Sequence, residues 1–133
     1  MICLDTTFLI DLWRNRHDST HAAVRLLAEN SAEVFVVPVM AVGEFLEGAA
    51  YISEARYREA LAFLAAFEFG SFSPRTASQY AHVTARLRHD NQLKGRSQAD
   101  LWIAGFAIEH RSRLASRNRR HFEGIDGLDL LDY

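Results

Sequence analysis

The sequence predicts an α/β fold of three layers, with a mainly parallel central sheet of about four to five short strands flanked by helices. Three observations support this prediction. Short, uninterrupted apolar runs such as residues 34–37 (VFVV) are typical of strands that are buried on both faces. These runs alternate with longer segments in which apolar residues recur at helical spacing. Strands separated by one or two helices are typical of a parallel sheet.

The chain begins with elements that predict one strand and two helices. Residues 1–6 form a short apolar run and predict the first buried strand. Residues 7–14 place their apolar side chains at helical spacing and predict the helix that follows. The polar residues 18–20 are good N-caps and predict a second helix that ends near Glu29.

The middle of the chain repeats this pattern. The run at residues 34–37 predicts the second strand, and the proline after it ends the strand. Residues 39–51 return to helical spacing, and Ser53 can cap a further helix. Residues 69–72 predict a third, weak strand.

The last part of the chain predicts two long helices and two strands. Ser73 followed by Pro74 is a typical helix start, and we expect that helix to run to about His89. The next helix, residues 97–110, is apolar almost all round and should be central. Two further apolar runs predict strands at residues 113–116 and 128–131.

Composition is typical of one globular domain spanning residues 1–133. Apolar residues make up 49% of the chain and charged residues 24%. The single cysteine, Cys3, excludes an intrachain disulfide and favours a reducing compartment. No apolar run is long enough to span a membrane, and the N-terminus lacks the basic start of a signal peptide. We therefore expect a cytoplasmic protein.

Charge is distributed unevenly along the chain. Residues 1–69 carry 5 basic and 10 acidic residues, whereas residues 70–133 carry 10 basic and 7 acidic ones. An acidic half beside a basic half suits a protein that holds a cation next to a polyanion. The alternative is an ordinary solvated surface.

Four side chains with oxygen ligands lie near the ends of predicted strands. Asp5 closes the first strand, and Glu44 lies in the helix after the second. Asp100 lies in the first turn of the most apolar helix, and Asn118 follows the fourth strand. Function in such folds lies beyond the carboxyl ends of the strands. Buried carboxylates need a compensating cation, and oxygen ligands from several elements suit Mg²⁺ or Mn²⁺.

Each of these side chains also has a structural explanation. Asp5 could cap the helix that follows it, and Asp100 with Ser97 fits part of a capping box. Glu44 could pair with an arginine at the surface, and Asn118 could be a turn residue.

Four motifs follow one another along the chain. They are residues 2–11 (ICLDTTFLID), 42–49 (VGEFLEGA), 100–105 (DLWIAG) and 114–122 (LASRNRRHF). In this order the motifs resemble those of PIN-domain ribonucleases of the VapC toxin type, and the resemblance extends from residue 2 to about residue 131. It implies a PIN-like three-layer fold for the domain.

The resemblance also implies an activity and a set of site residues. It implies a Mg²⁺-dependent endoribonuclease that hydrolyses RNA phosphodiester bonds, with Mn²⁺ as a substitute cofactor. By position, Asp5, Glu44 and Asp100 would be catalytic carboxylates that bind the metal. Asn118 would occupy the fourth catalytic position, where many members have Asp. Because its amide brings no charge, a second metal would be held more weakly there.

Other residues would support the site. Thr6 and Ser116 would supply hydroxyl groups. Among nine basic residues between positions 86 and 121, those expected to contact RNA phosphates are Lys94, Arg96, Arg117 and Arg119. Alternatively, these arginines could cover carbonyl groups or pair with the acidic half. The histidines show no zinc-type spacing; an acid–base nuclease would use His121, the one nearest to the site.

The resemblance implies partners as well. It implies an RNA substrate, a cognate VapB-like antitoxin that packs in an apolar groove near the acids, and a homodimer. DNA would be contacted only through the antitoxin, and no membrane is expected. Three alternatives stay open: a housekeeping RNA-processing PIN nuclease, a degenerate non-catalytic PIN domain, and a receiver-like metal-binding module. The last would need a late lysine after a strand, and only Lys94 is available.

Overall fold

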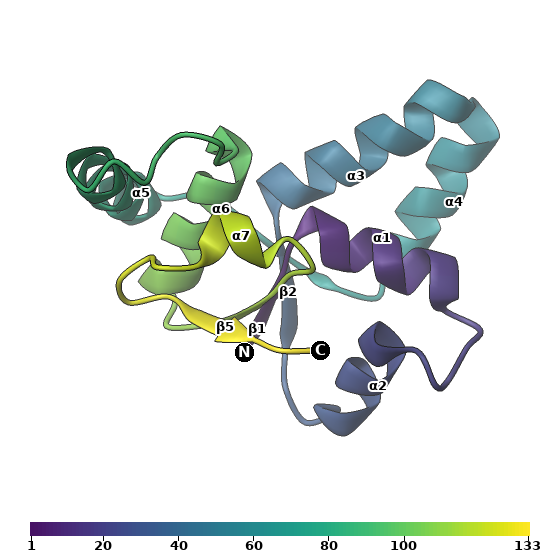
Figure 1. Cartoon of the computed structure of the whole chain (residues 1–133). Coiled ribbons are helices and arrows are strands. Elements are labelled where there is room, and N and C mark those ends of the chain that lie inside the picture. The colour runs from purple at the N-terminus through teal and green to yellow at the C-terminus, as the bar shows by residue number, and fades with distance from the viewer.

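A five-stranded parallel sheet with the order β3-β2-β1-β4-β5 forms the centre of the fold (Figure 1). The central strand β1 (Ile2–Leu4) pairs with β2 (Phe35–Pro38) and β4 (Arg113–Ala115). The outer strands are β3 (Glu68–Gly70) and β5 (Asp129–Leu131). Because all pairs are parallel, the carboxyl ends of the five strands lie at one edge of the sheet. The predicted fold class is confirmed.

Seven helices connect and cover the strands in the computed structural model, which describes all residues 1–133. Helices α5 and α6 lie on one side of the sheet, and α1 and α2 lie on the other (Figure 1). The helices are α1 (Thr6–Asn15), α2 (Ala22–Glu29), α3 (Val39–Ile52), α4 (Glu54–Leu64), α5 (Pro74–His89), α6 (Gln98–Glu109) and α7 (Arg119–Phe122).

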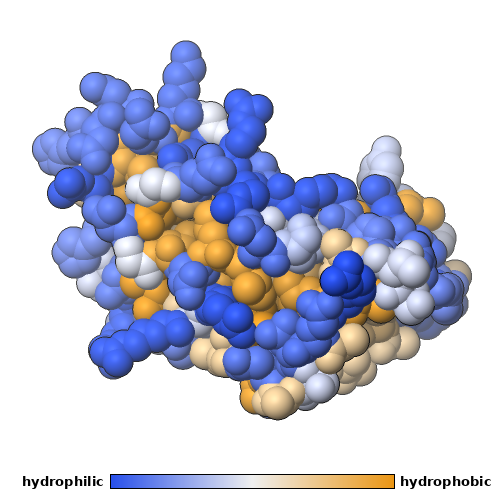
Figure 2. Space-filling view, turned by 60° about the horizontal axis from the view of Figure 1, so that its bottom comes forward, coloured by the Kyte–Doolittle hydropathy of each residue, from blue (hydrophilic) through white to orange (hydrophobic).

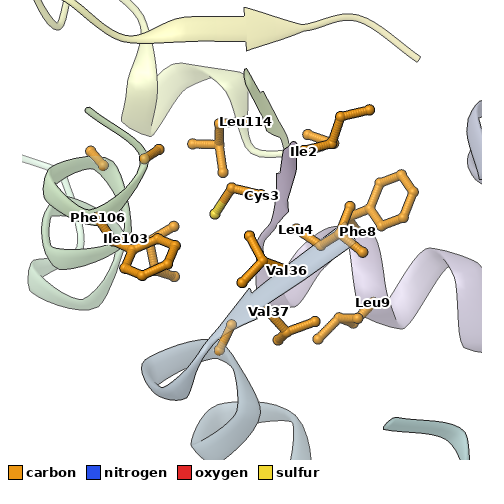
Figure 3. Close-up of a cluster of buried hydrophobic side chains, with 14 of the residues drawn as sticks. Ile2, Cys3, Leu4, Phe8, Leu9, Val36, Val37, Ile103, Phe106 and Leu114 are labelled. Carbon is orange, nitrogen blue, oxygen red and sulfur yellow. The ribbon is translucent and has the colours of Figure 1, made fainter. Parts of the chain in front are cut away.

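The core occupies both faces of the sheet. Figure 3 shows Ile103 and Phe106 of α6 on one side of the central strands, and Phe8 and Leu9 of α1 on the other. All residues of β1 are fully buried. A strand whose side chains alternate between two faces can be completely buried only when both faces are covered, which explains its uninterrupted apolar run.

Three local features differ from the sequence-based expectation. The first strand ends at Leu4, because Asp5 leaves the strand to cap α1. The cap of α2 is His21, whose ring nitrogen accepts from the Ala23 N–H at 3.2 Å, so the prediction that residues 18–20 cap this helix is wrong. Those residues form a separate polar turn instead. The four-residue helix α7 was not predicted, because one turn is too short to show helical periodicity.

Two features of the surface concern possible contacts. Figure 2 shows apolar side chains gathered over the middle of one face, with hydrophilic side chains around them. Contiguous apolar areas of this kind are typical of interaction surfaces. None of the seven helices combines the length and the apolar character that crossing a membrane requires.

The close packing of α5 against α6 depends on Gly105. A Cβ atom at this position would lie 2.9 Å from the Tyr80 backbone nitrogen and 3.1 Å from the Thr76 carbonyl oxygen. We expect Gly105→Ala to lower the free energy of unfolding by about 1.5 kcal/mol, because backbone atoms cannot yield as a side chain can. Urea unfolding followed by circular dichroism measures this change.

Gly43 provides a matched control within another helix. A Cβ atom at Gly43 in α3 would meet no atom within 4 Å. Gly43→Ala should therefore raise the free energy of unfolding by about 0.5 to 1 kcal/mol, as alanine is the better helix former. Equal effects of the two substitutions would contradict the close contact at Gly105.

Candidate active site

Asp5 lies at the carboxyl end of the central strand and is the N-cap of α1. Its carboxylate accepts a hydrogen bond from the Phe8 backbone N–H at 2.8 Å. The Thr7 hydroxyl donates at 2.9 Å, and the Ser116 hydroxyl, directly after β4, donates at 2.5 Å. Asp5 therefore does cap the helix, as the structural explanation proposed. It is also fully buried and connects the ends of two neighbouring strands.

Asp100 lies in the first turn of α6 and is almost completely buried. Its backbone N–H donates to the Ser97 hydroxyl at 3.4 Å, which is one half of a capping box. Its Oδ2 lies 2.5 Å from Nδ1 of His121 and 3.5 Å from Nδ2 of Asn118. The Asn118 nitrogen lies 2.8 Å from the same His121 nitrogen. Asp100, Asn118 and His121 therefore form one contiguous polar cluster.

The charge of Asp100 acts on the buried carboxyl group of Asp5 although the two residues belong to different elements. Burial, and to a smaller extent the negative charge of Asp100, raise the pKa of Asp5 from an ordinary 3.8 to about 6. Hydrogen bonds from Ser116, the Phe8 N–H and Thr7 act in the opposite direction. A negative charge at Asp5 thus costs free energy, and a cation bound beside it would offset this cost.

Glu44 is the exposed member of the three predicted acids. It lies on α3 and accepts a hydrogen bond from the Thr6 hydroxyl at 2.6 Å, so it borders the site through the residue that follows Asp5. It pairs with no arginine, so that alternative explanation does not hold. No group of three or more His, Cys, Asp or Glu side chains is arranged to hold a metal ion.

The chemistry of the donors nevertheless fits a divalent cation. Asp5 and Asp100 contribute carboxylate oxygens, and Asn118 contributes an amide oxygen, which are the ligands that hard cations prefer. In this structure the same groups are bonded to hydroxyls or to one another. Binding of a cation would therefore exchange these hydrogen bonds for metal–ligand bonds.

The side chain of Arg96 is held by hydrogen bonds to backbone carbonyl groups. Its guanidinium donates to the carbonyl oxygens of Gln92 at 2.8 Å, His121 at 2.8 Å and Glu123 at 2.7 Å. This is the structural role that we considered as the alternative to phosphate contact. These bonds tie the loop before α6 to the C-terminal end of α7, the short helix that carries His121.

Two further predicted phosphate contacts are also engaged with protein groups. Arg117 pairs with the buried Asp11 at 2.5 Å. Arg119 pairs with Asp132 and, at 3.7 Å, with Glu123. Both arginines therefore pair with acidic residues, which is one of the two alternatives to phosphate contact that the sequence left open.

Lys94 is the fourth predicted contact and has different surroundings. It is exposed and lines a wholly polar groove of about 270 Å³ together with Asn118, Arg120 and His121. Arg120, which was not singled out from the sequence, is also exposed and forms no ion pair. The groove therefore leads from two free cations to the cluster around Asp100.

Thr7 is the member of this site that sequence reasoning missed. Besides donating to Asp5, its hydroxyl accepts from the Arg117 backbone N–H at 3.0 Å and lies 3.3 Å from the Ser116 hydroxyl. It thereby fixes the segment after β4 against the start of α1. The sequence signal for this role is weak, because any threonine close to a helix cap has such hydrogen-bonding capacity.

Comparison with known proteins agrees with this architecture. The PIN domain family matches residues 2–128. The fold is similar to VapBC2 from Rickettsia felis bound to a DNA fragment from their promoter, with a TM-score of 0.82, 25% identity and coverage of 100% of this chain and 99% of that chain. It is also similar to DNA-bound VapBC from Salmonella typhimurium, with a TM-score of 0.85, 20% identity and coverage of 99% and 98%.

A third similar structure is VapBC-1 from nontypeable Haemophilus influenzae, with a TM-score of 0.81, 23% identity and coverage of 99% and 98%. No curated protein gives a significant sequence match. The family match covers nearly the whole length of the chain, and the parallel sheet carries Asp5 at its carboxyl edge. The chain therefore belongs to the PIN domain family.

Proposed function

We propose that this protein is a Mg²⁺-dependent endoribonuclease and the toxin of a VapBC-type pair. The observation that carries the proposal is the convergence of two buried acids from different elements: Asp5 directly follows β1, and Asp100 of α6 contacts Asn118 in the segment after β4. The PIN family match and the likeness to VapBC structures support it. Asp5 is fully buried with no cationic side chain beside it, which is costly for a carboxylate in a merely structural role.

The residues of the site would either bind the cation or position the residues that bind it. Asp5, Asp100 and Asn118 would hold the divalent cation, with Glu44 as the third acid at the border. When bound, the cation supplies a water of lowered pKa and neutralises charge on the scissile phosphate. Thr7 and Ser116 hold the Asp5 carboxylate in place from two sides.

The polar groove beside this cluster suits the RNA backbone. Lys94 and Arg120 line this groove and form no ion pair, so they are free to contact RNA phosphates. Hydrolysis by an activated water would leave a 5′-phosphate and a 3′-hydroxyl.

Incubation of a structured RNA pool with the purified protein tests this proposal. We expect cleavage with Mg²⁺ or Mn²⁺, no cleavage with EDTA, and a loss of at least about 100-fold in rate for Asp100→Asn. Arg58→Gln, a change at an exposed position on α4, is the matched control and should retain full activity. Cleavage that survives both EDTA and Asp100→Asn would contradict the proposal.

The same proposal includes an antitoxin partner. An apolar groove of about 190 Å³ lies between α1, α3 and α4, and Ile10, Trp13 and Phe45 are among the residues that line it. Glu44 lines the groove as well, so a bound segment would reach the edge of the acid site. The similar VapBC structures contain the antitoxin, and two of them contain DNA, which supports an antitoxin here and DNA contact through it.

A further inference from the structure

The imidazole of His121 occupies a defined position inside the candidate metal site. Its Nδ1 lies 2.5 Å from Oδ2 of Asp100, and the imidazole is 27% exposed whereas the Asp100 side chain is 12% exposed. The position does not depend on this contact alone. The next residue, Phe122, is buried in the core, and Arg96 binds the His121 carbonyl oxygen. These two anchors fix the backbone of His121, so that its imidazole lies beside the Asp100 carboxylate.

The hydrogen-bonding capacities of Asp100, Asn118 and His121 show which of their atoms face one another. The amide nitrogen of Asn118 can only donate, and Nδ1 of His121 cannot accept from it while donating to Asp100. Turning the amide so that its oxygen faces Nδ1 would replace the Asn118 Nδ2–H donation to Oδ2 of Asp100, at 3.5 Å, by a contact between two acceptor oxygens. The Asp100 carboxylate, the Asn118 amide and the His121 imidazole nitrogen thus meet within hydrogen-bond distance of one another, and a single proton at Nδ1 does not satisfy both of its neighbours.

This donor set differs from one made only of oxygen atoms. Mg²⁺ is bound almost entirely by oxygen ligands and holds its waters tightly. Imidazole nitrogen is a better ligand for later divalent metals, and Mn²⁺ accepts a mixture of carboxylate and imidazole. A histidine at this place therefore changes the selectivity of the site.

We propose that His121 is a direct nitrogen ligand of the divalent cation and that it gives the site a preference for Mn²⁺ over Mg²⁺. The inference rests on the proposed function, since it concerns the cation that Asp5 and Asp100 would hold. The contact with Asp100 holds the imidazole where both groups would bind the cation.

Pulsed electron paramagnetic resonance of bound Mn²⁺ tests the ligand directly and does not depend on activity. The full chain without a polyhistidine tag should show ¹⁴N modulation from one coordinated imidazole. The modulation should disappear in His121→Gln and in His121→Asp. It should persist in His110→Gln, because His110 faces Glu109 and Phe106 at the other end of α6.

Titration calorimetry with Mn²⁺ and Mg²⁺ measures the selectivity of the same proteins. His121→Gln should weaken Mn²⁺ binding by roughly tenfold. His121→Asp, which replaces nitrogen by a charged oxygen ligand, should recover affinity and shift the preference toward Mg²⁺. Circular dichroism melting of both variants checks that they are folded.

The outcomes separate this inference from the proposed function. Mn²⁺ that binds without ¹⁴N modulation, or modulation that is unchanged in His121→Gln, would overturn the role of His121 and leave the nuclease proposal standing. Failure of the wild-type protein to bind either cation would overturn the metal site of the proposed function, and this inference with it.

Discussion

Replacing Asp5 with asparagine should abolish RNA cleavage and at the same time stabilise the fold. Asp5 is fully buried, and its pKa is raised to about 6 by burial and by the charge of Asp100. At neutral pH the folded protein therefore carries a charge that the unfolded chain bears more easily. We expect the free energy of unfolding of Asp5→Asn at pH 7 to exceed that of the wild type by about 2 kcal/mol.

The pH dependence gives this prediction its sign. In the folded state Asp5 binds its proton more tightly than in the unfolded state, where the ordinary pKa is 3.8. Its favourable contribution is complete below the unfolded value and is lost as the pH rises through about 6. The advantage of Asp5→Asn should thus be small at pH 3.5 and reach its full size above pH 6.5, which urea unfolding across this range measures.

Asp5→Ala is the control that separates charge from hydrogen bonding. Alanine removes the charge but also the cap of α1 and the acceptor for the Ser116 hydroxyl. It should lose about 1 kcal/mol relative to Asp5→Asn. A stability difference between Asp5→Asn and wild type that is the same at pH 3.5 and pH 7 would contradict the raised pKa. Added Mn²⁺ should stabilise the wild type and leave Asp5→Asn almost unchanged.

Arg96→Ala should destabilise the protein by about 2 kcal/mol, because it removes three charge-assisted hydrogen bonds to backbone carbonyls at once. The loss should be visible as a lower urea midpoint. Cleavage should fall as well, since the segment carrying His121 loses its tie to the loop before α6. The variant should not change how strongly RNA binding depends on salt.

Lys94→Ala is the matched control two residues away. Its exposed ammonium lines the polar groove, so its removal should leave stability unchanged. The slope of log affinity for RNA against log salt concentration should decrease by about one, as expected for one lost phosphate contact. Asp100→Asn serves as the background for both measurements, so that RNA is not cleaved. A reduced salt slope for Arg96→Ala with unchanged stability would reverse the roles assigned to the two residues.

The sheet was predictable because its strands are short apolar runs placed between helical segments. The complete burial of β1 and the cap at Ser73 follow directly from local sequence patterns. The position of Asp5 could also be predicted, because parallel topology places the ends of all strands at one edge. Asp100 ends no strand, and its place in the first turn of α6 was predicted from the cap at Ser97. The resemblance to PIN domains then implied that these acids belong to one site.

The surroundings of the basic residues could not be predicted. Arg96 and Lys94 are almost neighbours in sequence, yet one binds carbonyl oxygens and the other faces the groove. The difference depends on how the loop folds against α7, a helix of one turn that leaves no periodic signal. The contact of His121 with Asp100 depends on the same short helix, so a histidine in a basic stretch gave no indication of it.

The central position of β1 has a consequence for protein synthesis. The contact between Ser116 and Asp5 joins residues that are 111 positions apart, and β1 pairs with β4 over a similar separation. A ribosome therefore exposes Asp5 early but must release residues 113–118 before the two halves of the site can meet. Translation itself thus delays assembly of the candidate site until residues 113–118 have emerged.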